Sequence, residues 1–316
     1  MQGRAFWTVA PGRGEIRAET LAADGVVVRT VASGVSRGTE ALVFSGRVPE
    51  SQYSAMRAPL MGGAFPFPVK YGYAAVGMTE AGGRVFVLHP HQDVFVAPEG
   101  MCVAVPDAVP TRRAVLAANM ETALNILWDA APLAGERVSV IGAGVVGLLT
   151  AALIARIPAA RVTVVDIDST RQAPAAAFGC GFALPADAPG DQDLIVHASA
   201  SEAGLRLALS RAAFEGRIVE ASWFGDAEVA LKLGGAFHAR RLRIVSSQVG
   251  SVAGVMRGRR THAQRLGAAL SLLADDAYDS LLEADTAFAA LPARMPGLLA
   301  SGLCHVVDYP DGFGRV

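Results

Sequence analysis

The first hundred residues carry short runs in which apolar and polar residues alternate. Such runs begin at Gly25, Arg84, Asp93 and Met101, and Gly and Pro residues separate them. Short alternating runs with this punctuation favour a small β-barrel or sandwich. At Thr111 the period changes, and TRRAVLAANMETALNILWDA predicts one long helix with Thr111 as its N-cap.

From Arg137 the pattern alternates between strands and helices. RVSVIG, RVTVVDID, DLIVHASA, GRIVEASWF and RLRIVSSQVG are predicted strands, while VVGLLTAALIAR and SEAGLRLALSRAAF are predicted helices. A further helix, STRQAPAAAFG, is expected to be broken by Pro174. Repeated strand–helix units predict a parallel sheet covered on both faces, so the chain belongs to the α/β class.

The last third of the pattern is less regular. After Gly250 comes an arginine-rich loop, and a helix is predicted over 261–274. A closing segment over 284–309 has mixed character and ends in the strand-like sequence CHVVDY.

Composition narrows the class of protein. The 316 residues suit two domains, and 52% of them are hydrophobic, which is enough for a sizeable core. A formal net charge of -1 argues against a nucleic-acid partner. The three cysteines form no CxxC pair, so a disulfide framework and a four-cysteine zinc site are excluded and a reducing compartment fits.

One uncharged stretch, 138–155, is long enough to raise the question of a membrane span. Glycines in its first half favour a buried strand, a tight turn and a buried helix instead. The N-terminus lacks the pattern of a signal peptide. We therefore expect a cytoplasmic protein with no membrane contact.

The strongest chemical signal is Ile141-Gly142-Ala143-Gly144-Val145-Val146-Gly147, a GxGxxG sequence between a predicted strand and a predicted helix. In a dinucleotide-binding loop the first glycine permits the tight turn, the second lets a pyrophosphate approach, and the third lets helix and strand pack closely. The start of the helix, at Val145 and Val146, offers N–H groups to the phosphates.

Asp166 ends the next predicted strand. A carboxylate at that position accepts hydrogen bonds from the adenosine ribose and repels the extra phosphate of NADP, so it favours NAD. Arg171, in the following helix, is the one residue nearby that complicates this preference.

Further residues are predicted to border the cofactor because they follow strands of the same sheet. Ser199 lies at the carboxyl end of the predicted strand DLIVHASA, and Ser222 and Trp223 lie at that of GRIVEASWF. The carboxyl ends of parallel strands face the ligand crevice, which places these residues near ribose and nicotinamide. His197 is interpreted as a packed histidine near that crevice.

The order of these elements resembles the medium-chain dehydrogenase/reductase superfamily over nearly the whole chain. The resemblance rests on that order, on IGAGVVG with Asp166, and on two motifs, SGVSRGTE and YGYAAVG. It implies a GroES-like β-barrel catalytic domain over 1–116 and 252–316. It also implies a Rossmann doubly wound parallel-sheet cofactor domain over 117–251.

The same resemblance implies that this chain has lost the zinc sites of its relatives. Arg37, Tyr73 and Ala118 stand at the three positions that ligate catalytic zinc, and LHPHQDVFVAP replaces the four-cysteine structural lobe. A zinc site needs several thiolate, imidazole or carboxylate ligands around one point, so no metal is expected. SGVSRGTEALVFSGRVP resembles most the branch that contains bacteriochlorophyllide dehydrogenase.

Hydride transfer without zinc needs a side-chain acid or base near the reacting oxygen. Thr39 matches the position of the proton-relay hydroxyl, although it could simply satisfy local backbone groups. Tyr73 could act as the acid or base, or fill the space that zinc vacates. Glu121 could pair with Arg37 in place of metal-centred charge, or lie on a solvated helix face. The resemblance implies that Thr122 borders the nicotinamide.

Two smaller features complete the candidates. His89 and His91 form an H-x-H without an evident third ligand, so a structural or substrate-facing role is favoured over a metal site. Arg257, Arg259 and Arg260 could reach the cofactor pyrophosphate or coat a surface loop.

The leading hypothesis is a zinc-independent oxidoreductase that transfers a hydride between NAD(H) and a secondary alcohol or ketone. The first alternative is a quinone or enoyl reductase of the same fold that uses NAD(P)H. The second is a non-catalytic NAD(H)-binding protein. The family leads us to expect a homodimer.

Overall fold

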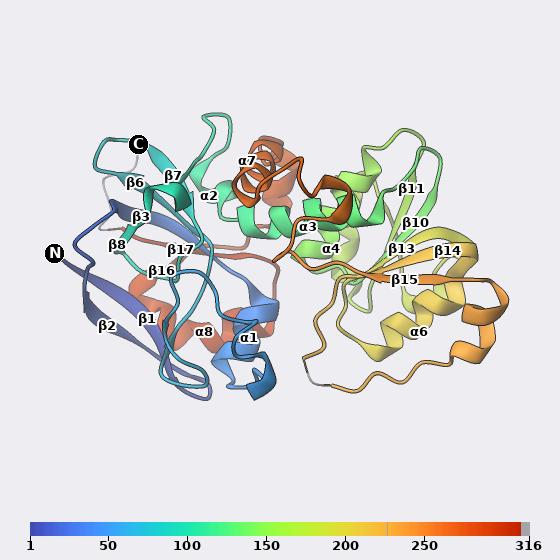
Figure 1. Ribbon diagram of the computed structural model, residues 1–316, viewed down its shortest axis with the longest axis horizontal. Coiled ribbons are helices and arrows are strands. Elements are labelled where there is room, and N and C mark those ends of the chain that lie inside the picture. The colour runs from blue at the N-terminus through green and yellow to red at the C-terminus, as the bar shows by residue number, and fades with distance from the viewer. Residues whose placement is uncertain (226, 311–316) are drawn as a thin grey trace. The chain divides into compact units, whose positions relative to one another are not determined.

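The computed structural model describes residues 1–225 and 227–310. It divides into two compact units, coloured by residue number in Figure 1. Unit 2 comprises Asn119–Arg265, and unit 1 comprises the residues on either side. The sequence suggested limits at 116/117 and 251/252, so the second division in the structure falls later along the chain.

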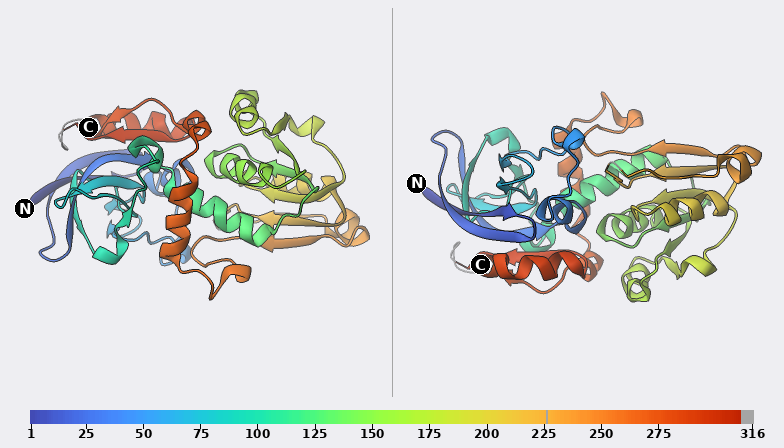
Figure 2. Two further views of the ribbon diagram at one scale, coloured as in Figure 1. Left: turned by 90° about the horizontal axis from the view of Figure 1, so that it is seen from above. Right: turned by 90° about the horizontal axis from the view of Figure 1, so that it is seen from below.

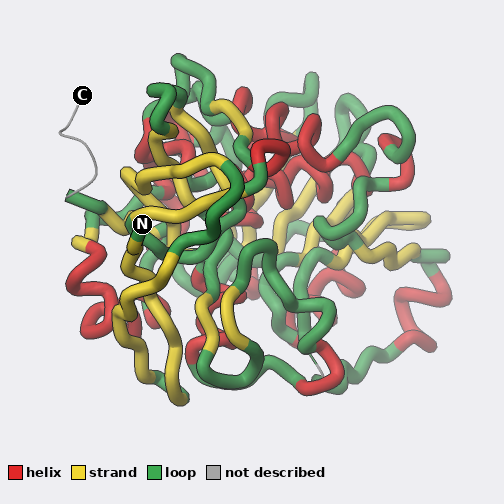
Figure 3. Tube along the Cα trace, turned by 60° about the vertical axis from the view of Figure 1, so that its left-hand side comes forward, coloured by secondary structure: helices red, strands yellow, loops and turns green. Residues whose placement is uncertain are grey.

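Unit 1 is built mainly from short strands in two sheets, which alternate with long loops in Figure 3. The first sheet has the order β2-β1-β5-β4, and the second has the order β16-β17-β3-β6-β7-β9 with β8 paired to β3. The strands are β1 Gln2–Ala10, β2 Arg13–Thr20, β3 Val26–Val35, β4 Gly62–Gly63, β5 Val69–Lys70, β6 Ala75–Thr79, β7 Arg84–Val87, β8 Val94–Ala97, β9 Val103–Ala104, β16 Thr286–Ala287 and β17 His305–Asp308. The helices of this unit are α1 Arg37–Phe44, α2 Thr111–Ala114 and α8 Leu291–Ala300.

The end of the described chain completes the larger sheet of unit 1. Strand β17 pairs antiparallel with β3, with Val307 opposite Ser33. Helix α8 contributes Leu291, Met295 and Leu298 to the buried cluster that also contains Phe6 and Phe44. The closing segment therefore returns to the first domain, as the sequence predicted.

Unit 2 is a six-stranded parallel sheet with the order β12-β11-β10-β13-β14-β15. The strands are β10 Arg137–Ile141, β11 Arg161–Val165, β12 Gly181–Ala183, β13 Gln192–His197, β14 Ala212–Glu220 and β15 Arg243–Ser246. The helices are α3 Ala117–Ala130, which begins just before the unit, α4 Val145–Ala155, α5 Gln172–Ala177, α6 Glu202–Arg211 and α7 His262–Leu272, which continues beyond it.

The strand order shows why helices cover both faces of this sheet. Helix α4 connects β10 to β11 in one direction along the sheet, and α6 connects β13 to β14 in the other. Right-handed crossovers in opposite directions lie on opposite faces. Both views in Figure 2 show helices packed along the strands of this unit. The doubly wound parallel sheet predicted from the sequence is confirmed.

The predicted helix over 111–130 is two helices, which corrects the sequence interpretation. Helix α2 ends at Ala114 and α3 begins at Ala117, and the residues between them, Val115 and Leu116, are fully buried. Tertiary burial of this pair overrides the helical period. The helix N-cap is Pro110 rather than Thr111.

Two further predictions differ in detail. Pro174 does not break its helix, because it lies in the first turn of α5, where a missing N–H costs no hydrogen bond. A separate 3₁₀ turn, Ser169–Arg171, precedes it. The short strand β12 and the helical turn at Leu233–Phe237 have no counterpart in the sequence prediction.

Within residues 1–225 and 227–310, every helix is too short or too polar to cross a membrane. The uncharged stretch 138–155 forms β10, the glycine-rich turn and α4. Most of its residues are buried, and the exceptions include Gly144, Val145 and Val146 at the start of α4.

Candidate functional site

The glycine-rich loop has a different physical requirement at each glycine. Gly142 has a φ of +107°, and a Cβ there would lie 2.7 Å from the Ser199 backbone nitrogen. At Gly147 a Cβ would lie 1.9 Å from the carbonyl oxygen of Gly142. At Gly144 a Cβ would meet nothing within 4 Å. The loop thus has a tight turn, a close helix contact and an open position between them, which fits a bound dinucleotide.

Helix α4 points its N-terminus at that open position. Gly144 is the N-cap and is exposed, Val145 and Val146 are partly exposed, and no acidic residue occupies the first turn. The first N–H groups of a helix have no partner within it, and they carry partial positive charge. These groups would bind the pyrophosphate of a nicotinamide cofactor.

Asp166 lies directly after β11 and holds the glycine-rich loop from the side. Its Oδ2 accepts the Ala143 N–H at 2.6 Å, and its Oδ1 accepts the Asp168 N–H at 2.9 Å. A carboxylate has about four acceptor sites, so acceptor capacity remains for ribose hydroxyls. The sequence did not predict the structural contact to the loop.

The neighbours of Asp166 also bear on cofactor choice. Arg171 pairs with Asp168 at 3.1 Å between Nε and Oδ2, so its charge is partly balanced by a carboxylate. Ile167 is an apolar side chain that is 85% exposed. Sequence reasoning did not single out Ile167, although its position directly after the strand-ending carboxylate is visible in the sequence.

A hydrogen-bonded chain occupies the carboxyl ends of β13 and β14. His197 and Glu220 are register partners in the parallel ladder, and His197 Nδ1 lies 2.7 Å from Glu220 Oε2. His197 Nε2 lies 2.7 Å from Ser199 Oγ. Ser222 donates its N–H to Glu220 Oε1 at 2.7 Å and accepts the Ala200 N–H through Oγ at 3.0 Å.

Two members of this hydrogen-bonded chain were candidates in the sequence analysis, and their place beside a cofactor stays a prediction. Ser199 and Ser222 were predicted beside the cofactor, and His197 was interpreted as packed; it is fully buried. Glu220 was not predicted. The sequence did contain a signal for Glu220. Glu220 follows the apolar residues of one predicted strand, just as His197 follows those of the predicted strand before it.

In unit 1, hydrogen bonds hold the side chains at two of the three predicted zinc-ligand positions. Arg37, the first residue of α1, donates to the carbonyl oxygens of Leu299 and Ala300 at 3.3 Å, and to that of Gly302. Tyr73 donates to Ser36 Oγ at 2.6 Å. Ala118 presents only a methyl group.

Tyr73 has the surroundings of a phenol that stays protonated. Burial raises the pKa of Tyr73 above its ordinary value, the hydrogen bonds of Tyr73 with Ser36 and Thr39 oppose the shift, and the negative charge of Glu40 adds to it. The hydroxyl of Thr39 therefore lies within hydrogen-bonding reach of this phenol. Tyr71 lies on the same side, with its ring centroid 6.1 Å from that of Tyr73.

The predicted Arg37–Glu121 ion pair is wrong. Glu121 pairs with Arg265, with 3.0 Å between Oε1 and Nε, and both side chains are buried. Arg265 also donates to Asn125 Oδ1 at 2.6 Å and to the Val249 carbonyl at 2.6 Å. These contacts of Arg265 join the start of α7 to α3, which explains why unit 2 extends to residue 265.

His89 and His91 turn to different partners. The ring of His89 stacks on Phe95 with centroids 3.7 Å apart, and burial lowers the pKa of His89 to about 3. His91 donates from Nε2 to Glu40 at 3.0 Å and accepts the Ser33 hydroxyl at Nδ1, at 2.7 Å. Both histidines therefore have structural roles.

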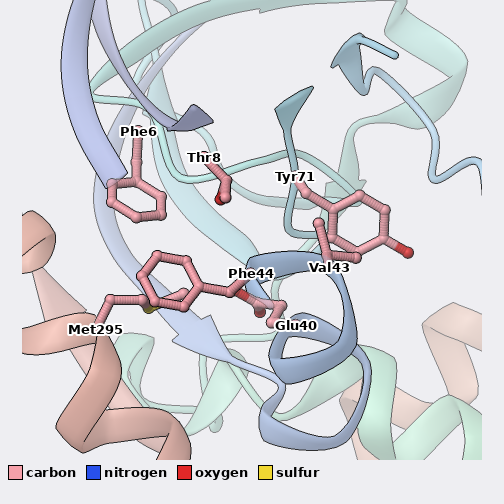
Figure 4. Close-up of a pocket in the computed structure, with 7 residues that line it drawn as sticks. All are labelled: Phe6, Thr8, Glu40, Val43, Phe44, Tyr71 and Met295. Carbon is pink, nitrogen blue, oxygen red and sulfur yellow. The ribbon is translucent and has the colours of Figure 1, made fainter. Parts of the chain in front are cut away.

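Glu40 also lines a small cavity in unit 1, shown in Figure 4. The cavity has room for about one water molecule, so it is too small for an alcohol substrate. Its lining residues are Phe6, Thr8, Glu40, Val43, Phe44, Tyr71 and Met295.

Arg257, Arg259 and Arg260 are exposed, Trp223 is partly exposed, and Thr122 lies on α3. In the part of the chain that the structure describes, no three His, Cys, Asp or Glu side chains gather in a group that could hold a metal ion.

Comparisons with known proteins bear on the fold. No protein-family model matches the chain. The L-idonate 5-dehydrogenase of Escherichia coli K-12 is 14% identical, with a TM-score of 0.79 over 98% of this chain and 99% of that one. A short chain alcohol dehydrogenase from Escherichia coli CFT073, complexed with NADH, is 16% identical, with a TM-score of 0.77 over 98% and 99%. A putative zinc-binding dehydrogenase from Sinorhizobium meliloti 1021, bound to NADP, is 15% identical, with a TM-score of 0.77 over 98% and 99%.

These likenesses show the fold. The chain has the α/β fold of the alcohol dehydrogenases, in which a β-rich catalytic domain is combined with a Rossmann domain. In sequence, a probable D-xylulose reductase A from Aspergillus fumigatus is 35% identical over 77 residues, which are 24% of this chain. The chain covers only 22% of the length of that relative.

Proposed function

We propose that this protein is a zinc-independent oxidoreductase that transfers a hydride between NAD(H) and a secondary alcohol or ketone. The observation that carries the proposal is the glycine-rich loop. Gly142 and Gly147 are required by packing, whereas the open space at Gly144 is what a pyrophosphate needs. The alcohol dehydrogenase fold and the sequence match to a xylulose reductase support the same class of reaction.

Unit 2 would hold the cofactor. The first turn of α4 would bind the pyrophosphate, Asp166 would accept from the adenosine ribose, and Ile167 would lie against adenine. The bound cofactor supplies the hydride acceptor or donor. The carboxylates of Asp166 and Asp168 would repel the extra phosphate of NADP, so NAD is the preferred form, although solved relatives of the fold are bound to NADH and to NADP.

Unit 1 would handle the proton. In carbonyl reduction, the Tyr73 phenol would turn its proton from Ser36 Oγ to the substrate oxygen and act as the general acid. Ser36 and Thr39 would orient the phenol and stabilise the phenolate that forms, because both hydrogen bonds lower its pKa. In alcohol oxidation the same phenolate would take the hydroxyl proton.

The absence of a zinc requirement rests on the residues that stand at the ligand positions. The Arg37 guanidinium is held by three carbonyl oxygens near the C-terminal end of α8. Tyr73 is held by Ser36, and the methyl group of Ala118 has no donor atom. The phenol proton of Tyr73 would then stabilise the developing negative charge on the substrate oxygen, as a Lewis-acidic metal ion otherwise would.

The first experiment is a titration of purified, metal-analysed protein with NADH and NADPH, followed by nicotinamide fluorescence. Tight NADH binding without stoichiometric zinc, followed by turnover of secondary alcohols or ketones, is the expected result. Turnover of activated alkenes or quinones in place of ketones would favour a quinone or enoyl reductase. Cofactor binding with no turnover of either panel would indicate a non-catalytic NAD(H)-binding protein.

A further inference from the structure

The hydrogen-bonded chain at the ends of β13 and β14 has the geometry of an activated nucleophile. Ser199 Oγ lies 2.7 Å from His197 Nε2, and His197 Nδ1 lies 2.7 Å from Glu220 Oε2. A hydroxyl, an imidazole and a carboxylate in this order are the parts of a serine nucleophile with its base and orienting acid. Such a set is recognised by geometry and roles, whatever the order in sequence.

The surrounding bonds set the direction of every proton in the chain. Glu220 is an acceptor only, so His197 donates from Nδ1 and accepts the Ser199 proton at Nε2. The Ser201 hydroxyl accepts the Gly204 N–H at 3.0 Å, and it lies 2.9 Å from Ser199 Oγ, to which it donates. The Ser199 proton therefore points at the base, and a lone pair on its oxygen is available to an incoming carbon.

The local backbone also fits this role. Ser199 lies in the turn between β13 and α6, at the carboxyl end of a parallel strand, where ligands bind in open α/β sheets. The next residue, Ala200, has a φ of +51°, a strained conformation for a residue other than glycine. Ser199 is partly exposed, while His197 is fully buried and shielded from bulk water.

A helix terminus lies beside the nucleophile. Ser199 precedes by two residues the N-cap of α6, Ser201. The N-terminus of a ten-residue helix carries partial positive charge, which would stabilise an oxyanion that develops next to it. Gly204 keeps this space open, because a Cβ there would lie 2.4 Å from Ser199 Oγ.

We propose that Ser199, with His197 as base and Glu220 as orienting acid, forms a second reactive site that attacks activated carboxylic esters. The Ser199 oxygen bonds to the ester carbonyl carbon while its proton passes to His197 Nε2. The bond from carbon to the alcohol oxygen breaks, and the alcohol leaves with that proton. Water then attacks the acyl-serine, its proton returns through His197 to Ser199 Oγ, and the carboxylic acid is released.

The protein contains a second set of the same side chains, which serves as an internal control for the reactivity of Ser199. Ser33, His91 and Glu40 in unit 1 form a second set of the same residue types, with distances of 2.7 and 3.0 Å. Ser33 is only 1% exposed, and its Oγ is also bonded to the Tyr309 hydroxyl at 2.9 Å. An acyl donor has no access to it, so only Ser199 should react.

The test uses a fluorophosphonate probe on the full-length protein, with peptide mass spectrometry to find the labelled serine. We expect labelling of Ser199 and none of Ser33. Ser199→Ala should abolish the labelling, and His197→Gln should slow it by about 100-fold, the usual contribution of a general base. Ser210→Ala is the matched control, since Ser210 is an exposed serine on the same helix, α6, and its loss should change nothing.

Thermal melts identify variants that fail to fold. If His197→Gln is unfolded, Glu220→Gln takes its place and should slow labelling by roughly tenfold or more. Hydrolysis of p-nitrophenyl acetate should fall in parallel with labelling in each variant. The proposal is overturned if Ser199 in the wild-type protein is labelled no faster than Ser210, or if labelling of Ser199 is unchanged in the folded His197 or Glu220 variant.

Discussion

Replacing two glycines of the same loop by alanine should separate packing from cofactor binding. At Gly147 the new methyl group would lie 1.9 Å from the carbonyl oxygen of Gly142, which belongs to the backbone and cannot rotate away. At Gly144 the methyl group would meet no protein atom within 4 Å, and the φ of −73° and ψ of 176° suit alanine. The first change should therefore cost stability, and the second should cost affinity for the cofactor.

The magnitudes follow from these distances. For Gly147→Ala, the start of α4 must move away from Gly142 by about 1.1 Å to reach the shortest distance that real Cβ atoms tolerate, 3.0 Å. Overpacking of this kind costs about 1–3 kcal/mol, less about 0.5–1 kcal/mol that alanine returns within a helix. Because the opposing atom belongs to the backbone, the upper part of the overpacking range applies, and a net loss of about 1–2.5 kcal/mol would lower the Tm by roughly 2–10 °C.

Thermal unfolding and NADH titration of both variants provide the assay. Gly144→Ala should keep the wild-type Tm within about 2 °C, because nothing crowds its methyl group. Its Kd for NADH should rise by at least about tenfold, equivalent to 1.4 kcal/mol, because the methyl group occupies the space for the pyrophosphate. A Gly144→Ala protein that binds NADH as tightly as wild type would refute the assignment of Gly144 to the pyrophosphate-binding position. An unchanged Tm for Gly147→Ala would refute the packing argument.

Three other substitutions test the charged and phenolic groups. Asp166→Ser should narrow the preference for NADH over NADPH by about tenfold in the ratio of Kd values, because the repelling carboxylate is gone; an unchanged ratio would contradict its role. Tyr73→Phe should lower kcat for ketone reduction by about 100-fold with little change in the Kd for NADH, whereas Tyr71→Phe should change both only a few-fold. Because the pKa of Tyr73 is raised above its ordinary value by burial, the wild-type reduction rate should stay level through neutral pH and fall only in strongly alkaline solution, and an earlier fall would contradict the assignment. Arg265→Met should cost about 3–5 kcal/mol by leaving Glu121 buried and unpaired. Burial already raises the pKa of Glu121, and a raised carboxyl pKa favours the folded state at low pH, so the Tm deficit of this variant should be smaller at pH 5 than at pH 8.

The two-domain α/β fold was predictable because its signals are local. The strands that begin at Arg137 and Arg161 repeat a β-branched pattern, and the apolar helix between them follows a glycine-rich turn. A buried parallel strand and a helix packed on it both need this pattern, whatever the rest of the chain does. The position of Asp166 after its strand follows from the same regularity.

The side-chain partners were not predictable in the same way. Glu121 was expected to pair with Arg37, yet its partner is Arg265, far along the chain. Which opposite charge reaches a buried carboxylate depends on how α3 and α7 are brought together, and residue spacing contains no record of that. For the same reason the sequence offered no sign that Asp166 would accept the Ala143 N–H.

The sequence by itself determined the glycine-rich loop after β10. Tight turns and close backbone approaches leave glycine as the only residue that fits, and those glycines are visible in one short run. Only the tertiary structure decided the hydrogen-bonded chain of Ser199, His197 and Glu220. Neighbouring strands in a parallel sheet set His197 beside Glu220 through their register, and register depends on how whole strands pair. Local chemistry is therefore readable from the order of residues, whereas the proton partners of a site are set by contacts between segments that are distant in sequence.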